Sequence, residues 1–400
     1  MTCTTSGKHP VILSACRTAG GKFGGAFKDL SAPDLGAAAI KEAVARAKVE
    51  ASDVEEVIMG NGWQAGVGAN PARIALFRSG LPQSIPAFTI NKRCGSGLRA
   101  IMLASDRIRL KDAACMVAGG MESATNVPYL LPDARWGMRM GEKKAVDGLH
   151  QDGFMCPLAG MLMGATAEIL VKEYGITREE QDAYALDSHR KAVAAMESGA
   201  FDDEIVTVVL KDRKKGDIPV RQDEIPRKDT TIEALAKLPP VFFKDGTITA
   251  GSSSALCDAG SAVVVADPDW AASKGLAPMA EILGYASAAL AADHMGLGPT
   301  LAMPKALAKA GMTLADMDVI EINEAFAAQI IACHRALPFD MEKLNLCGGA
   351  IALGHPIGAT GSKILATLIN ILKQKDKELG IVSACIGGGQ GVAMVVRRLA

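Results

Sequence analysis

Two cysteines and one histidine stand in glycine-rich turns of this 400-residue chain, and these residue types can do covalent chemistry. Cys94 lies in the run Asn-Lys-Arg-Cys-Gly-Ser-Gly-Leu, His355 lies in Gly-His-Pro-Ile-Gly-Ala-Thr-Gly, and Cys385 precedes Ile386 and three glycines. A thiol beside an imidazole base suits acyl transfer through a thioester, and a second thiol can move a further proton. The three turns therefore suggest a nucleophile, a base and a second acid/base.

Cys94 follows an apolar stretch typical of a strand and precedes a helical pattern. A sulfur at such a turn lies near unpaired N–H groups and the positive end of the helix dipole, and both favour the thiolate. The alternative is a buried structural thiol. Gly95 to Ala100 also matches the dinucleotide fingerprint G-x-G-x-x-A, which would fit an NAD-dependent dehydrogenase. That interpretation leaves His355 and Cys385 without roles.

The other two turns also have a structural and a functional interpretation. Pro356 moves His355 out of the helical region and is typical of a helix start, while the surrounding glycines leave room for a ligand. Residues 381–384 form a buried strand that delivers Cys385 to its glycines. A packed histidine and a core cysteine are the alternatives, but three consecutive glycines cost conformational entropy and indicate close approach of the backbone to something.

The elements that must position these turns occur twice. Residues 45–61 and 307–323 align without a gap, and each contains a helix end, a short acidic turn and a β-branched pair. Strand and helix patterns alternate after both segments, in residues 88–120 and 344–391. The repeat predicts two similar α/β halves around a mainly parallel sheet.

Local signals predict several helices. Ser31 and Asp34 form a capping-box-like start for a helix over residues 35–48. Further helices are expected over three stretches: residues 164–174, 177–198 and 360–373. Between the halves, Lys211 to Lys228 holds seven basic and four acidic residues. Most of these charges suit a solvated loop, but the cluster could also meet a polyanionic ligand.

Composition excludes several classes of protein. Hydrophobic residues make up 49% of the chain, and 43 basic residues oppose 44 acidic ones, which argues against a general nucleic-acid or anionic-membrane binder. No apolar run is long enough to span a membrane. The nine cysteines form no C-x-x-C pair, so neither a disulfide scaffold nor a zinc site is expected. Neither end resembles a targeting signal, so we expect a cytoplasmic protein.

Taken together, the motifs resemble those of the thiolase family, and the resemblance covers the whole chain. They are Asn91–Gly97, Met163–Glu168, Thr249–Ser254, Asn323–Phe326, Gly354–Gly361 and Cys385–Gly389. The resemblance implies an α/β protein with a five-layered αβαβα fold built from two similar halves. Residues 1–123, completed by 257–278, would form the N-terminal half and 279–400 the C-terminal half. Residues 124–256 would form an inserted loop domain that carries much of the coenzyme A site.

The resemblance also implies catalytic roles. Cys94 would be the acylated nucleophile, and His355 would take its proton and help hold a thioester oxygen. Cys385 would be the acid/base at the α-carbon. Asn323 would orient a water that forms one oxyanion hole with His355. The backbone N–H groups of Cys94 and Gly387 would form a second.

For the substrate, Arg227 and Ser254 match positions that contact coenzyme A, and Met163 and Phe154 are further candidates. Acyl-CoA would be a substrate rather than a tightly bound cofactor, no metal is expected, and a homodimer or homotetramer is implied. Either condensation of two acetyl-CoA or thiolytic cleavage of 3-ketoacyl-CoA would fit. Leu162 replaces a histidine common in the family, which leaves the chain length open. A non-catalytic acyl-CoA carrier would be expected to lack the nucleophile or the base.

Overall fold

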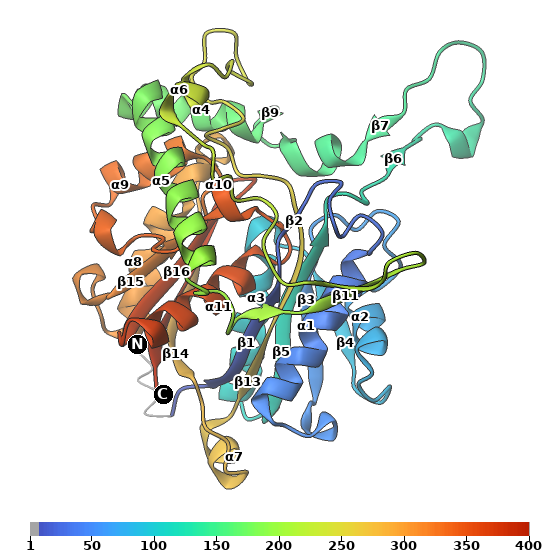
Figure 1. Cartoon of the computed structure of the whole chain (residues 1–400), viewed down its shortest axis with the longest axis vertical. Helices are drawn as coiled ribbons and strands as arrows, with labels where there is room; N and C mark the ends of the chain where they lie inside the picture. The colour runs from blue at the N-terminus through green and yellow to red at the C-terminus, as the bar shows by residue number, and fades with distance from the viewer. Residues whose placement is uncertain (1–7, 400) are drawn as a thin grey trace.

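The computed structural model describes residues 8–399, and its main feature is a large mixed sheet with the strand order β15-β16-β17-β14-β1-β13-β5-β3-β4 (Figure 1). Only two residue pairs join β1 (Val11–Thr18) to β14 (Ala280–Ala289), namely Val11 with Glu281 and Ile12 with Ala280. The sheet therefore consists of two smaller sheets that meet at this junction. The polar start at residues 1–7, including Cys3, lies outside the described residues, as does Ala400.

Each half supplies one sheet. The N-terminal sheet contains β1, β3 (Glu56–Gly60), β4 (Ala87–Ile90), β5 (Cys115–Ser123) and β13 (Cys257–Ala266). The C-terminal sheet contains β14, β15 (Val319–Ile322), β16 (Leu379–Ile386) and β17 (Gln390–Arg398). Strand β3 is parallel to β4 and β5, and β15 is parallel to β16, but the other pairs between these strands are antiparallel. The prediction of a mainly parallel sheet is therefore wrong. The short turn Gly387–Gly389 between β16 and β17, for example, permits only a hairpin.

Helices form three layers around the two sheets. Helices α3 (Ser96–Arg109) and α11 (Thr360–Gln374) lie between the sheets, at the centre of Figure 1. Helices α1 (Ala32–Ala47) and α2 (Pro71–Ser79) cover the N-terminal sheet, and α8 (Gly298–Ala310) and α9 (Ala327–Ala336) lie on the C-terminal side. The result is the five-layered αβαβα fold. The capping box at Ser31 is confirmed, because its N–H and Oγ both donate to Asp34 Oδ2, at 2.9 and 2.6 Å.

The two central helices touch at glycines near their N-terminal ends. A Cβ placed on Gly361 would lie 2.5 Å from the main-chain nitrogen of Leu98, and one on Gly97 would lie 2.8 Å from Ser362 Oγ. Glycine is therefore required for this approach. Because the helix starts are in contact, the turns that precede them are also brought together.

Part of the segment between the halves lies at the top of Figure 1, where one hairpin projects far from the body, and another part runs down along the layers. Its helices are α4 (Met163–Tyr174), α5 (Arg178–Glu197) and α6 (Ile232–Ala236), and its strand pairs are β6 (Tyr129–Leu130) with β7 (Val146–Asp147), β8 (Met155–Cys156) with β9 (Met161–Leu162), and β11 (Val208–Asp212) with β12 (Gly216–Val220). The remaining strands and α-helices are β2 (Gly21–Lys22), β10 (Ile205–Val206), α7 (Pro268–Ser273) and α10 (Ala350–Leu353). Among the described helices, none is long and apolar enough to cross a membrane.

Candidate active site

A strained turn presents Cys94. The preceding residue, Arg93, has φ of +52°, a left-handed conformation that costs energy for a non-glycine residue. Side chains hold this turn in place. Asn91 Oδ1 accepts from the Arg93 N–H at 3.0 Å, while Ser96 Oγ accepts from the Lys92 N–H at 2.8 Å and donates to the Arg93 carbonyl at 2.7 Å. These hydrogen bonds therefore hold the turn between β4 and α3 in the conformation that presents Cys94.

His355 faces Cys94 across the junction of the halves. Its Nε2 lies 3.1 Å from Cys94 Sγ, and its Nδ1 lies 2.6 Å from Thr360 Oγ1. Burial lowers the pKa of His355 to about 3, and the positive charges of Lys363 and Arg93 act in the same direction. The imidazole is therefore neutral at physiological pH and can accept a proton.

The thiol of Cys94 is not poised as a thiolate. Burial raises its pKa above the ordinary value, against the opposing effects of the Arg93 charge and of the backbone N–H groups of Gly387 and Cys94 itself. The N–H groups at the helix start favour the thiolate, as the sequence indicates, but desolvation outweighs them. To react as a nucleophile, Cys94 would need a base, and His355 is in contact with it.

Strand β16 delivers Cys385 to the same place. The side chain is 1% exposed, and burial raises its pKa well above the ordinary thiol value. The chain then turns through Gly387, Gly388 and Gly389, the last two with φ of +88° and +80°, so glycine is needed there. This turn directs the Gly387 N–H toward the sulfur of Cys94.

Asn323 follows β15 with an unpartnered amide. Its Nδ2 and Oδ1 are both buried, and neither has a hydrogen-bond partner among the described residues. The next residue, Glu324, is by contrast fully engaged. Its carboxylate accepts from Tyr184 Oη, Ser188 Oγ, Asn345 Nδ2 and the Ile351 N–H. Glu324 thus anchors the segment, while the amide of Asn323 is free to bind water or substrate.

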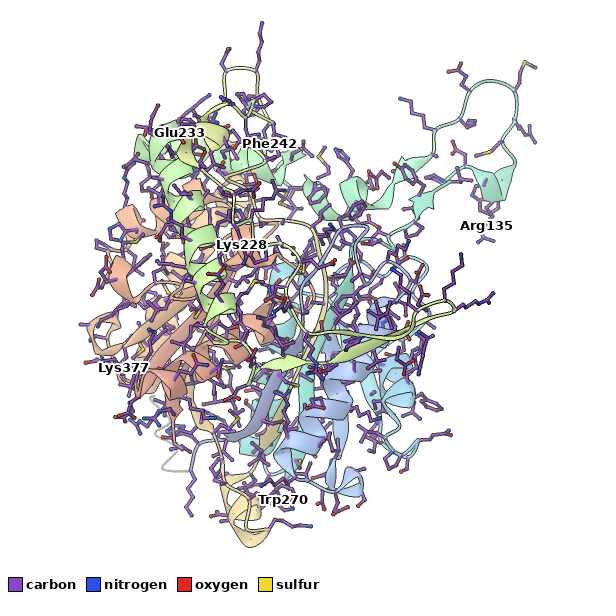
Figure 2. All side chains as sticks on the ribbon, in the orientation of Figure 1. Arg135, Lys228, Glu233, Phe242, Trp270 and Lys377 are labelled. Atoms are coloured by element: carbon purple, nitrogen blue, oxygen red, sulfur yellow. The ribbon has the colours of Figure 1, made fainter. Side chains whose placement is uncertain are left out.

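One cavity of about 420 Å³ collects most of the predicted site residues. It is lined by Cys94, His355, Cys385, Gly387, Ser254, Met163 and Phe154. Asn323 and Arg227 are not among the lining residues, although Ala325 and Phe326 just after Asn323 are. Apolar side chains absent from the predicted set close the cavity: Val241, Phe242, Leu256, Met295, Phe326 and Ile357. Phe242 lies at the end of the molecule opposite Trp270 of α7 (Figure 2).

The basic cluster of residues 211–228 lies outside this cavity. Part of it is the exposed hairpin of β11 and β12, where Lys211 pairs with Asp217 at 2.8 Å. Lys228 pairs with Glu197 at 2.7 Å, so these two lysines fit the interpretation as solvated surface charges. Arg227 is exposed, and its main-chain N–H donates to His189 Nδ1 at 3.3 Å.

Two further residues support the site and were absent from the predicted set. Thr360 contacts His355 and stands in the quoted glycine motif, but its partner becomes visible only in three dimensions. Glu122 at the end of β5 is buried beside the loop of His355. Its carboxylate accepts from Asn61 Nδ2 and from the N–H groups of Gly62, Trp63 and Gly358, at 2.6, 2.8, 3.2 and 2.8 Å. The hydrophobic periodicity of the sequence gives no indication that Glu122 supports the site.

Comparisons with known proteins identify the family of the chain. Residues 10–269 match the model of the thiolase N-terminal domain and residues 276–398 match that of the thiolase C-terminal domain. The chain therefore belongs to the thiolase family. It is an acyltransferase that carries out reversible acyl transfer between coenzyme A thioesters.

The chain is similar to several curated proteins over nearly its whole length. It is 52% identical to an acetyl-CoA acetyltransferase of Escherichia coli, with 98% of this chain and all of that protein covered. An acetyl-CoA acetyltransferase of Cupriavidus necator is 49% identical, with 97% and 99% covered. The crystal structure of the Bacillus anthracis acetyl-CoA acetyltransferase superposes with a TM-score of 0.96 at 43% identity, covering 98% of this chain and 99% of the other.

Proposed function

We propose that this thiolase acts on short acyl groups, joining two acetyl-CoA into acetoacetyl-CoA and catalysing the reverse cleavage. The observation that carries the proposal is the single cavity shared by Cys94, His355 and Cys385. The bulky apolar side chains that line it, among them Phe154 and Phe242, support a small acyl group. The names of the similar proteins, acetyl-CoA acetyltransferases, support the same substrate.

In the acylation step, His355 Nε2 accepts the proton of Cys94 as the sulfur attacks the thioester carbonyl carbon. The negative charge that develops on the carbonyl oxygen is stabilised by the N–H groups of Cys94 and Gly387. The carbon–sulfur bond to coenzyme A breaks, and the leaving sulfur takes the proton of Cys385. The products are acetyl-Cys94, free coenzyme A, protonated His355 and a Cys385 thiolate.

In the condensation step, the Cys385 thiolate removes a proton from the α-carbon of a second acetyl-CoA. The raised pKa of this buried thiol makes its thiolate a stronger base. The enolate oxygen is held by protonated His355 and by a water bound to Asn323. The enolate carbon attacks acetyl-Cys94, and the departing sulfur takes its proton back from His355, so that every group returns to its starting state.

The inserted domain of residues 124–256 supplies the binding surface for coenzyme A, which enters and leaves as a substrate. Phe154, Met163 and Ser254 line the cavity, where the reactive end of the thioester lies. Arg227 is exposed outside it, and we assign it to a phosphate of the same molecule. The protein works as a homodimer or homotetramer in the cytoplasm. Apolar side chains exposed on the projecting hairpin, such as Trp136 and Met140, support self-association, which light scattering would test.

Thiolysis of 3-ketoacyl-CoA substrates of increasing length tests the substrate class. We expect kcat/KM to be highest for acetoacetyl-CoA and to fall as the chain lengthens, because Phe154 and other bulky side chains line the cavity. Phe154→Ala should relax the preference, and Leu131→Ala, an exposed position that does not line the cavity, is the control. A preference for long chains in the unmodified protein would overturn the proposed substrate. Absence of all turnover would instead favour an acyl-CoA carrier.

A further inference from the structure

A threonine contacts the ring of His355 on the side away from the nucleophile. Thr360 is the first residue of α11 and is buried, and its Oγ1 lies 2.6 Å from His355 Nδ1. The same oxygen lies 2.9 Å from the main-chain carbonyl of Pro356 and donates to it. The other ring nitrogen, Nε2, lies 3.1 Å from Cys94 Sγ. Each nitrogen of the base thus has a different and specific neighbour.

The single proton of the Thr360 hydroxyl decides which ring nitrogen of His355 is protonated. A threonine hydroxyl has one proton, and a carbonyl oxygen can only accept. If the hydroxyl of Thr360 donates to Pro356, it can only accept from His355, so Nδ1 carries the ring proton. A neutral imidazole has a single N–H, so Nε2 then presents its lone pair to Cys94. The opposite tautomer would lose the bond to Pro356 and would point an N–H at the thiol.

We infer that Thr360 is a positioning residue that holds His355 in the tautomer able to accept the proton of Cys94. The inference rests on the proposed role of His355 as the base. When Nε2 takes the proton, Nδ1 still donates to Thr360, so the ring keeps its orientation in both charge states. A second anchor is the main-chain N–H of His355, which donates to the Ala255 carbonyl at 2.9 Å.

Two substitutions separate the hydroxyl from the shape of the side chain. Thr360→Val keeps the shape and removes the hydroxyl, whereas Thr360→Ser keeps the hydroxyl. Single-turnover acetylation of Cys94 by acetyl-CoA, followed by intact mass, should slow by up to about tenfold in the valine variant, as expected for one lost hydrogen bond. The serine variant should stay within about twofold of the unmodified protein. KM for acetyl-CoA should change less than kcat in both variants, because Thr360 does not line the cavity.

A spectroscopic measurement tests the tautomer directly. Long-range proton–nitrogen NMR correlations of the His355 ring in the full chain should show a protonated Nδ1 and a bare Nε2, and Thr360→Val should yield a mixture of tautomers. A protonated Nε2 in the unmodified protein, or unchanged acetylation of the valine variant, would overturn the inference. If the valine variant does not fold, the tautomer measured in the unmodified protein still tests the inference. Failure of the unmodified protein to become acetylated would count against the proposed function instead.

Discussion

Glu122 and Cys385 occupy equivalent positions in the two halves of the molecule. The repeat aligns Gly60 of β3 with Ile322 of β15, and these residues pair with Gly120 of β5 and Ser383 of β16. Glu122 lies two residues after Gly120 on β5, and Cys385 lies two residues after Ser383 on β16. The repeat also aligns Asn61, which follows β3, with Asn323, which follows β15. Asn61 donates to Glu122, whereas the amide of Asn323 has no hydrogen-bond partner among the described residues. In the N-terminal half Asn61 and Glu122 support the site. In the proposed mechanism Asn323 and Cys385 of the C-terminal half take part in the reaction.

Glu122→Gln should therefore destabilise the loop of His355. Four N–H donors surround the carboxylate, so the amide group of glutamine would place an N–H against another N–H. We expect a loss of about 1–3 kcal/mol in the free energy of unfolding, measured by urea titration, together with a lower kcat. Glu281→Gln, on the partly exposed rim of β14, is the control and should have a smaller effect on both. Unchanged stability would show that Glu122 does not support the loop.

Cys94 should be the first cysteine to react with dilute iodoacetamide. It is partly exposed and contacts His355, whereas the other seven described cysteines are buried. Peptide mapping should find Cys94 labelled in step with loss of activity, and acetyl-CoA should protect it. Cys333→Ala should react like the unmodified protein. Labelling of Cys16 or Cys333 in step with inactivation would contradict the assignment.

Cys385→Ser should separate acylation from condensation. The serine hydroxyl has a pKa far above that of a thiol, so it should not move the α-proton at a useful rate. Intact mass should still show one acetyl group on Cys94, formed more slowly, because the coenzyme A sulfur can leave as a thiolate without the proton of Cys385. Condensation to acetoacetyl-CoA should fall by at least about a hundredfold. Cys94→Ser should lose both. Near-normal condensation by Cys385→Ser would mean that another group is the base.

Arg227→Ala should raise KM for coenzyme A with a smaller effect on kcat, the pattern of lost uniform binding. The difference from the unmodified protein should shrink in high salt, because exposed charges are screened. Lys211→Ala is the matched control, since this lysine already pairs with Asp217 on the exposed hairpin. Equal effects of the two substitutions would indicate general charge attraction rather than a contact at Arg227.

As the pH falls, the free energy of unfolding should decrease before the imidazole of His355 becomes protonated in the folded protein. Because the pKa of His355 is lowered to about 3, its imidazole stays neutral as the pH falls through 6.5, the ordinary value. Single-turnover acetylation should therefore show no inflection near pH 6.5. Between pH 6.5 and 3 the unfolded chain binds a proton at this residue that the folded chain does not, so stability falls with falling pH. His355→Gln should reduce that slope in urea titrations, and an acetylation midpoint near 6.5 would contradict the pKa.

Much of the fold follows from local patterns. The helix expected over residues 164–174 is observed as Met163–Tyr174, and the one over 177–198 as Arg178–Glu197 with Thr177 as its cap. These agree because periodicity and capping act within a few residues of the chain. Strand direction depends instead on which strands become neighbours, so the alternation of strand and helix patterns predicted too much parallel pairing.

The site was predictable only in part for the same reason. Glycine-rich turns marked Cys94, His355 and Cys385, because unusual backbone leaves a signature in composition. The ionisation of Cys94 depends on how much solvent the fold removes, and a helix-start argument contains no measure of burial. The hydroxyl of Thr360 gains its role only from the ring that the fold places beside it. The boundaries at residues 123, 257 and 279 stay predictions.

The contact of the central helices at Gly97 and Gly361 has a consequence for how the site responds to heat. Main-chain atoms meet there, and main-chain atoms have no rotamers to exchange. Warming increases rotamer hopping in a core long before helices separate. The spacing of the main chains that carry Cys94 and His355 should therefore persist up to the temperature at which the layers come apart.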